Sequence, residues 1–266
     1  MRFKKTNTIL DEICQNKAKQ LGLKLENQGL EKLKKQIRDS AFKPSSFKKA
    51  LQKPGISLIA EIKKSSPAME GENIRKNFDL ERIAKIYEKS KARAISVVTE
   101  EKYFSSDPQY LKTVKSLVGI PVLRKDFLID EYQIYESKAM GADAVLMIAS
   151  ILQKAQIKKL YHLARNLELD VLVEAHNKEE VRVILNTIEP DIIGINNRDL
   201  KTMKIDLANF ESLVERIPKN VLKVAESGIE SGKDVSRMQR AGADGVLVGT
   251  SLMKAQDIEA KIKELI

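Results

Sequence analysis

Two similar stretches of sequence indicate the fold: Met140-Gly-Ala-Asp-Ala-Val-Leu146 and Ala241-Gly-Ala-Asp-Gly-Val-Leu247. In each, a glycine of the kind that ends a helix is followed by a short apolar run typical of a buried strand. The two stretches lead into the fourth and the eighth of the apolar runs described next. The repeat therefore indicates two related halves, each with four strand-and-helix units.

Short apolar runs alternate with longer segments of helical period from Ser57 onward. The runs span residues 58–62, 94–98, 121–123, 144–148, 171–173, 191–195, 221–225 and 245–248. Their spacing leaves room for one helix after each run, as in parallel βα units. No GxGxxG motif follows any run, which argues against an open dinucleotide-binding sheet. We predict an α/β fold: a single (β/α)8 TIM barrel over residues 56–266.

Residues 1–55 precede the first predicted strand and have the pattern of helices. Apolar residues recur at helical spacing from Ile9 to Ile37, and Thr8-Ile-Leu-Asp11 has the form of a capping box. Lys53-Pro54-Gly55 breaks the pattern before the first strand. We expect an N-terminal helical extension that packs on the barrel.

Composition excludes several classes of protein. Of the 266 residues, 42% are hydrophobic and 32% are charged, so we expect neither a disordered nor a membrane-spanning chain. The N-terminus lacks the apolar core of a secretion signal, which predicts a cytoplasmic protein. One cysteine, Cys14, and two histidines without metal-binding spacing predict no internal disulfide and no metal site.

The formal net charge of +10 suits nucleic acid, an anionic membrane surface or a phosphorylated small molecule. Aromatic residues make up only 5% of the chain, and no motif interleaves them with basic residues, which argues against nucleic-acid binding. We expect a phosphorylated small molecule as the partner, with no nucleic acid and no membrane.

Charged and polar residues stand where the predicted strands end, the place where barrel enzymes carry their chemistry. An unpaired charge facing the filled barrel would be costly, so we interpret these residues as a paired network around a substrate. They are Glu61, Lys63, Lys125, Glu174, Asn196 and Glu226.

Strand alternation turns some neighbouring charged residues away from that network. Lys64, Arg124 and Asp199 point to the other face, so we interpret them as structural or as loop residues. His176 lies two residues past Glu174, and we interpret it as a loop residue rather than a site residue.

Small residues occupy the loops after the last two strands, the usual phosphate position in this fold. Ser227-Gly228 and Gly249-Thr250 let backbone amides approach an anion. The long segment from Lys64 to Asn77 after the first strand is a candidate lid.

Taken in order, the strand-end motifs resemble those of the indole-3-glycerol phosphate synthase family of tryptophan biosynthesis, from about residue 8 to the end of the chain. The motifs are Glu61-Ile-Lys63-Lys-Ser-Ser66-Pro67, Thr99-Glu-Glu-Lys-Tyr-Phe104, Lys125-Asp-Phe127, Leu172-Val-Glu174, Gly194-Ile-Asn196-Asn-Arg198-Asp-Leu200, Glu226-Ser227-Gly228 and Gly249-Thr250. The resemblance implies closure of the indole ring of 1-(2-carboxyphenylamino)-1-deoxyribulose 5-phosphate, with loss of CO2 and water.

The resemblance also implies catalytic roles. Lys125 would be the general acid on the ketone oxygen, and Glu174 an acid and base for dehydration. Lys63 would be the cation near the substrate carboxylate and a candidate second acid. Glu61 and Asn196 would orient the lysines and the hydroxyls.

Substrate binding is likewise implied by the resemblance. Ser66 and Arg198 would assist at the carboxylate, with Arg198 held by Glu226. The benzene ring would be walled by Phe104, Phe127, Leu146 and Ile148, and the phosphate would be held by Ser227, Gly228, Gly249 and Thr250.

The chemistry is consistent with these residue types. The ketone needs a proton as the aromatic carbon attacks it, and we expect a desolvated lysine near other cations to have a lowered pKa. Loss of the carboxylate is driven by restored aromaticity, so we expect no cofactor, neither pyridoxal nor a metal.

Two motifs depart from the family pattern. Ser66-Pro67-Ala68 stands in place of Ser-Pro-Ser, followed by a longer stretch from Met69 to Asn73, and Ser105-Ser106 replaces Asn-Gly. The alternative is another phosphosugar barrel, phosphoribosylanthranilate isomerase. A resemblance to that family would imply a cysteine base at the end of the first strand, whereas Cys14 lies in the extension. A barrel that binds phosphosugars without catalysis is disfavoured by the lysines and Glu174. Association with other tryptophan-pathway enzymes stays open.

Overall fold

The computed structural model describes residues 3–27, 29–40, 42, 45–67 and 72–266. Within them, eight parallel strands close into a barrel in chain order, and the last strand pairs with the first. The strands are β1 (Ser57–Ile62), β2 (Ala94–Val98), β3 (Val122–Lys125), β4 (Ala144–Ile148), β5 (Asp170–Ala175), β6 (Ile192–Asn196), β7 (Leu222–Glu226) and β8 (Gly245–Val248). The predicted (β/α)8 TIM barrel is confirmed.

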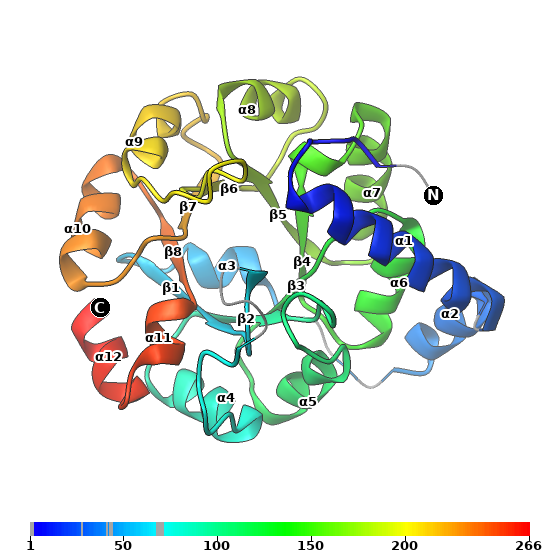
Figure 1. Cartoon of the computed structure of the whole chain (residues 1–266), viewed down its shortest axis with the longest axis horizontal. Coiled ribbons are helices and arrows are strands. Elements are labelled where there is room, and N and C mark those ends of the chain that lie inside the picture. The colour runs from blue at the N-terminus through cyan, green and yellow to red at the C-terminus, as the bar shows by residue number, and fades with distance from the viewer. Residues whose placement is uncertain (1–2, 28, 41, 43–44, 68–71) are drawn as a thin grey trace.

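Helices form a ring around the strands, as seen along the barrel in Figure 1. They are α4 (Leu80–Lys89), α5 (Gln109–Leu117), α6 (Glu131–Ala139), α7 (Lys154–Asn166), α8 (Lys178–Leu185), α9 (Ala208–Val214), α10 (Gly232–Ala241), α11 (Thr250–Lys254) and α12 (Ile258–Leu265), with a short 3-10 turn, η2 (Ala149–Ile151). The two glycines of the sequence repeat adopt left-handed φ angles, 86° at Gly141 and 105° at Gly242, where α6 and α10 end. A residue with a Cβ would be strained in that conformation, which explains the repeat.

Several strands extend further than their apolar runs predicted. The third run was expected at 121–123, but β3 continues through Lys125, which pairs with Val98. The fifth was expected at 171–173, but β5 continues through Glu174, which pairs with Ile148. Backbone pairing is indifferent to side-chain charge, so these strands carry charged residues into the barrel mouth.

Three helices precede β1: α1 (Ile9–Asn27), α2 (Leu30–Arg38) and α3 (Phe47–Leu51). Helix α3 meets the N-terminal ends of the strands, where the Ser57 hydroxyl donates to the Leu51 carbonyl oxygen. Helix α1 lies near the opposite end of the barrel and α2 lies beside α6. The expected extension is therefore present, and its proposed boundary at residues 55 and 56 falls between α3 and β1.

The capping box expected at Thr8 and Asp11 has a different form. The Asp11 carboxylate accepts hydrogen bonds from the backbone of Thr6 and Asn7, at 2.7 and 3.0 Å, instead of from Thr8. The chain turns sharply before the helix, at Asn7 with a φ of 58°, which brings these earlier N–H groups to the carboxylate.

The candidate lid is described only in part. Residues 68–71, which include Ala68 and much of the lengthened stretch, lie outside the described residues. None of the helices described is long and apolar enough to cross a membrane.

Candidate active site

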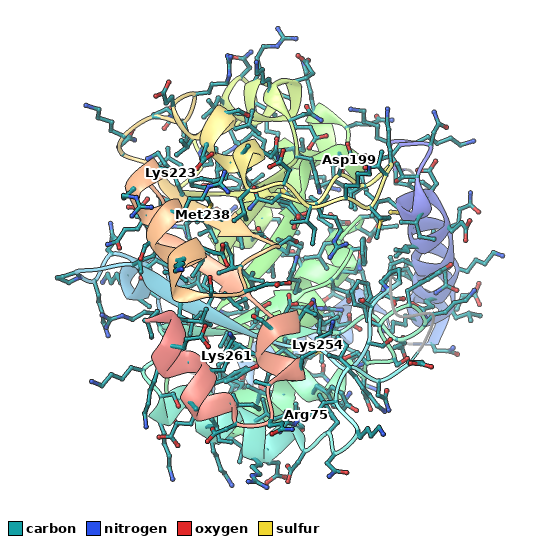
Figure 2. The ribbon with its side chains drawn as sticks, turned by 60° about the vertical axis from the view of Figure 1, so that its left-hand side comes forward. Arg75, Asp199, Lys223, Met238, Lys254 and Lys261 are labelled. Atoms are coloured by element: carbon teal, nitrogen blue, oxygen red, sulfur yellow. The ribbon has the colours of Figure 1, made fainter. Side chains whose placement is uncertain are left out.

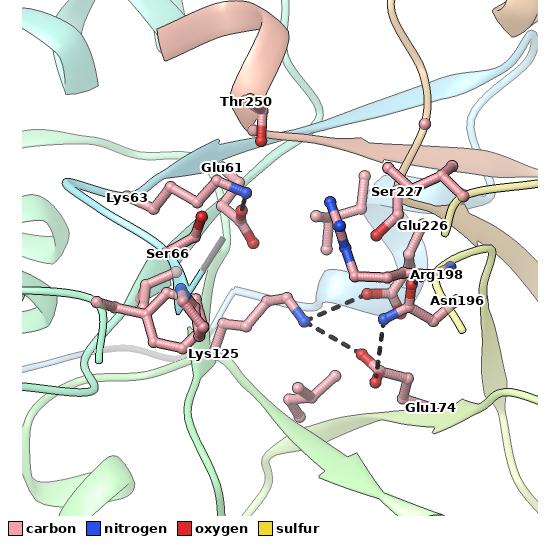
Figure 3. Close-up of a pocket in the computed structure, with 18 of the residues that line it drawn as sticks. Glu61, Lys63, Ser66, Lys125, Glu174, Asn196, Arg198, Glu226, Ser227 and Thr250 are labelled. Carbon is pink, nitrogen blue, oxygen red and sulfur yellow. Dashed lines mark hydrogen bonds and ion pairs between the residues drawn. The ribbon is translucent and has the colours of Figure 1, made fainter. Parts of the chain in front are cut away.

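One cavity of about 450 Å³ lies at the C-terminal ends of the strands. Every catalytic and substrate-binding residue predicted from the sequence lines it, although the residues come from all eight strands and the loops that follow them. Figure 3 shows the charged members converging from opposite sides of the barrel. The barrel topology therefore assembles the residues that the motifs singled out.

Lys125 stands at the centre of the site, between two acidic residues. Its Nζ lies 3.1 Å from Glu174 Oε2 and 3.4 Å from Glu226 Oε2 (Figure 3). Both carboxylates are buried, and Asn196 Nδ2 donates to the other oxygen of Glu174 at 3.3 Å. This arrangement fixes a cation and an anion side by side within reach of a bound ligand.

The expected lowering of the Lys125 pKa is wrong. Burial alone would lower it, but the carboxylates of Glu174 and Glu226 outweigh burial and raise the pKa of Lys125 well above its usual range. The sequence suggested that other cations would dominate its surroundings, whereas acids from β5 and β7 do. Lys125 is therefore held as an ammonium group, which carries a proton but gives it up less readily than an ordinary lysine does.

The pKa values of the two acids beside Lys125 are shifted in opposite directions. Burial raises the pKa of Glu226 to about 8, with the neighbouring Glu174 charge adding to the rise and Lys125 opposing it. The pKa of Glu174 is lowered, because Lys125 and His176 outweigh its burial. Neither oxygen of Glu226 accepts a hydrogen bond from the described part of the chain.

Arg198 is not held by Glu226, contrary to the expectation. Its Nη1 donates instead to the carbonyl oxygen of Met203 at 3.1 Å, and its backbone N–H donates to Asn196 Oδ1 at 3.0 Å. No ion pair to Arg198 is found among the described residues, and burial lowers its pKa. The loop after β6 turns back on itself, which brings the Met203 carbonyl oxygen to the guanidinium. A half-buried cation without an acid is suited to binding an anionic ligand.

Glu61 and Lys63 form a second charged pair on the opposite wall. Lys63 Nζ lies 3.0 Å from Glu61 Oε1, and both side chains are largely buried. Gly249 on the adjacent strand end packs against this pair, because a Cβ built on it would lie 2.3 Å from Glu61 Oε1. A side chain at position 249 would displace Glu61, so the glycine is needed for the acid as well as for any approach to an anion.

The apolar part of the cavity wall includes Phe104, Phe127, Leu146 and Ile148. The two phenylalanine rings lie 6.1 Å apart between centroids. The buried carboxylate of Glu100 holds Phe104 in place, accepting the backbone N–H groups of Tyr103 at 2.6 Å and Phe104 at 3.2 Å. These side chains form an apolar slot of the kind that an aromatic ring fills.

The loops after β7 and β8 form the remaining wall. Ser227 and Gly228 both have positive φ angles, 66° and 80°, in the turn after β7. Thr250 begins α11, whose first amides have no acceptor within the helix. Ser66 lies across the cavity, beside Lys63 in Figure 3.

The structure also brings in residues that sequence reasoning missed. Ile9, Leu10 and Ile13 of α1 line the cavity, so the extension forms part of its wall. Their helical spacing signalled only a buried face. His176 lies in the loop after β5, as interpreted, and outside the cavity lining, yet its ring contacts Glu174 from behind. A histidine close to a strand-end acid was the available signal.

Arg124 points away from the cavity, as strand alternation predicted. It is buried behind β3, where it pairs with Asp126 at 3.0 Å and Glu136 at 2.8 Å. Lys17 of α1 pairs with the same Asp126 at 3.0 Å. This buried network ties the extension to the residue next to Lys125.

Comparison with known proteins identifies relatives across almost the whole chain. A family model described as indole-3-glycerol phosphate synthase matches residues 10–265. The enzyme of that name from Thermoanaerobacter pseudethanolicus is 44% identical over 258 residues, which cover 97% of this chain and 97% of the relative. Its counterpart from Caldanaerobacter subterraneus subsp. tengcongensis is 45% identical, with the same coverage of both chains.

Solved structures support the fold alone. A 3-hexulose-6-phosphate synthase from Salmonella typhimurium has a TM-score of 0.64 at 14% identity, covering 79% of this chain and 96% of that one. A thiamine phosphate pyrophosphorylase from Pyrococcus furiosus has a TM-score of 0.56 at 17% identity, covering 79% and 93%.

Proposed function

We propose roles for the cavity residues of this chain, which belongs to the indole-3-glycerol phosphate synthase family. Its reaction is the ring closure of 1-(2-carboxyphenylamino)-1-deoxyribulose 5-phosphate with loss of CO2 and water, a carboxy-lyase step of tryptophan biosynthesis. One observation carries the assignment of roles: all the strand-end residues line a single cavity, around a lysine bound to two acids.

The cavity offers a complementary surface to each end of this substrate. The benzene ring fits the apolar slot, and its carboxylate lies toward Arg198, Lys63 and Ser66. Arg198 has no acidic partner in the described residues, so a substrate carboxylate would supply the missing anion. The phosphate lies at the far wall, on the amides of Ser227, Gly228, Gly249 and Thr250.

Ring closure begins when the aromatic carbon that bears the carboxylate attacks the ketone carbon. The Lys125 ammonium donates its proton to the ketone oxygen as charge develops there. The neighbouring acids keep Lys125 protonated before the reaction, and its position between them directs the proton into the cavity. CO2 then leaves, and its bonding electrons restore the aromatic ring.

Dehydration completes the reaction. The new hydroxyl leaves as water, and a proton is lost from the adjacent carbon. Glu174 serves as the acid and base of this step: its ionised carboxylate, 3.1 Å from the Lys125 ammonium, takes the proton from carbon, and the carboxylic acid so formed gives that proton to the departing hydroxyl. Asn196 holds the Glu174 carboxylate, and Glu61 holds Lys63 at the carboxylate end of the substrate.

The test is the appearance of indole absorbance and fluorescence when the purified protein meets its anilino-ribulose phosphate substrate. Glu174→Gln keeps the side-chain shape but removes the titrating group, so kcat should fall about 10² or more with KM largely kept. Wild-type turnover by Glu174→Gln would remove Glu174 from the mechanism.

The phosphorylated substrate is the proposed partner, in preference to nucleic acid or a membrane surface, and the proposed location is the cytoplasm. The basic charge is then a means of attracting an anionic substrate. If the purified protein shifted the mobility of nucleic acid in a gel in a salt-dependent way, at the concentration used for the enzyme assay, the result would contradict this proposal.

A further inference from the structure

We propose that His176 is a positioning residue for the reaction: an imidazolium that holds the Glu174 carboxylate from behind and keeps it ionised opposite Lys125. The inference rests on the proposed function of Glu174 and adds a residue outside the cavity lining to it.

The imidazole ring bridges two acids. Its Nε2 lies 3.2 Å from Glu174 Oε1, and its Nδ1 lies 3.1 Å from Glu180 Oε2. The ring is 9% exposed, so both contacts are shielded from water. Each Glu174 oxygen therefore faces a cationic group, Lys125 at Oε2 and His176 at Oε1.

The local backbone holds the ring in this position. The His176 N–H donates to Glu180 Oε2 at 2.8 Å, and its carbonyl oxygen accepts from Asn209 Nδ2 at 3.1 Å. Asn177 caps α8 and donates to the second oxygen of Glu180 at 2.7 Å. Glu180 is thus fixed at the start of α8, and it fixes the ring in turn.

The charges around the ring favour its protonated form. Burial alone would disfavour the imidazolium, but the close carboxylates of Glu174 and Glu180 outweigh burial and raise the pKa of His176 to about 10. Lys125 stands beyond Glu174 on the cavity side. A groove on the outer side carries further charged residues, namely Lys4, Lys5, Arg198, Asp199, Lys201, Lys204 and Asp206.

The geometry has a consequence for the acid and base step. Nε2 makes no well-aligned hydrogen bond in the described structure, so its contact with Glu174 is mainly between charges. Such a contact stabilises the ionised carboxylate and lowers the pKa of Glu174. Without the imidazolium, Glu174 would take up a proton at higher pH and would turn away from Lys125 more readily.

A purely structural role of His176 would have different consequences. If His176 only stabilises the start of α8, its replacement lowers thermal stability and leaves the chemistry untouched. The pH dependence of kcat separates the two roles, because stability does not enter it while the protein stays folded.

The experiment compares His176→Gln and His176→Phe with His162→Gln, a change at the exposed second histidine. We expect kcat of both His176 variants to fall about 10-fold or more and the acidic limb of kcat to move upward by about one pH unit. KM should change less than about twofold, since His176 does not line the substrate cavity. Unchanged kcat and an unchanged acidic limb in a folded variant would overturn the proposal.

Glu174→Gln separates this proposal from the one beneath it. If Glu174 acts as proposed and His176 acts through it, adding His176→Gln to Glu174→Gln has no further effect on kcat. A full and independent loss in the double variant would overturn the positioning role alone. Wild-type turnover by Glu174→Gln would overturn the role of Glu174 itself.

A second measurement does not depend on replacing His176. In His162→Gln, His176 is the sole histidine, so nitrogen NMR of its imidazole follows one titration. We expect the ring to stay protonated beyond about pH 8, above the usual value near 6.5. A midpoint at or below that usual value would overturn the proposal.

Discussion

At the scale of single residues, the site is a set of charges whose pKa values depend on one another. Lys125 and Glu174 stabilise each other's charged forms at 3.1 Å, whereas Glu226 beside them has a raised pKa. The Lys125 ammonium group lies close to both acids, and it stabilises the ionised form of Glu174 more than that of Glu226. Arg198 has the opposite character, as a cation that lacks an acid within the described site.

Lys125→Met should abolish ring closure, because it removes the proton donor and leaves a side chain of similar length. The expected loss of kcat is at least about 10², the scale of a general acid. Lys64→Met is the matched control, since Lys64 lies near the end of the first strand but outside the cavity lining. Initial rates of indole formation measure both variants. A folded Lys125→Met enzyme with near wild-type kcat would eliminate the assignment.

Arg198→Gln should weaken substrate binding through the loss of the carboxylate contact. A hydrogen bond to a charged group contributes about 1.5–3 kcal/mol, so the dissociation constant should rise about 10- to 100-fold. Calorimetry with the substrate analogue that lacks the ring carboxylate supplies the control, because wild type and variant should bind it equally. An equal loss for both ligands would place Arg198 elsewhere on the substrate.

At the scale of elements, the loops after the strands are held in place by hydrogen bonds, and these position cavity residues such as Phe104, which lie beyond the strands. The turn after β2 is built on Glu100, a buried acid that accepts from the backbone of Tyr103 and Phe104. The Phe104 carbonyl oxygen accepts from the Ser65 N–H at 3.1 Å, which joins this turn to the loop after β1. Arg75 joins the loop after β1 to the end of α11, donating to the Ala255 carbonyl oxygen at 2.5 Å; Figure 2 shows Arg75 near Lys254.

Glu100→Gln should loosen the turn that carries Phe104. The amide keeps one acceptor oxygen but places an NH2 group against backbone donors, which costs about 1–3 kcal/mol of unfolding free energy. The apolar slot is disturbed too, so kcat/KM should fall. Glu101→Gln is the control, because Glu101 is exposed and bonds only the Gln20 side chain among the described residues. Urea unfolding and steady-state kinetics test the pair; equal stability of the two variants would contradict this account.

At the scale of the whole molecule, the helical extension and the barrel form one structure. Lys17 and Lys24 of α1 pair with Asp126 and Glu136, at 3.0 and 2.6 Å. Leu10 and Ile13 belong to the same apolar core as the barrel strands and also line the cavity. The extension therefore contributes to folding and to the wall of the site together.

Glu226→Gln should stabilise the fold at alkaline pH. The folded pKa of Glu226, about 8, is above its ordinary value of 4.5, so its proton contributes stability below 4.5 that is lost as the pH rises through about 8. Glutamine never ionises, and the variant should exceed wild type above about pH 8 by a few kcal/mol.

Glu174→Gln is a control that should change the stability in the opposite direction. The pKa of Glu174 is lowered in the fold, so its charge stabilises the protein above its ordinary value of 4.5, and the amide should be the less stable form at neutral pH. Melting temperatures of the three proteins between about pH 5 and 9 test both signs. A Glu226→Gln protein less stable than wild type at pH 9 would refute the raised pKa.

Sequence patterns were sufficient to predict the barrel and to bring the proposed site residues to one end of it. Apolar runs and helical periods are local patterns, and in a parallel barrel every strand carries its last residues to the same end. Glu61, Lys125 and Glu174 could therefore be placed in one site without coordinates. The alternation of side chains along a strand predicted that these residues face the inside of the barrel. It also predicted that Arg124 points away from the cavity.

The interactions among those residues could not be predicted from the sequence. The raised pKa of Lys125, the separation of Arg198 from Glu226 and the contact of His176 with Glu174 depend on distances between different strands and loops. Electrostatic energy varies with such distances over a few ångströms, and no pattern within one strand contains them. The contribution of α1 to the cavity wall has the same origin, since its apolar face predicts burial but not the surface that buries it.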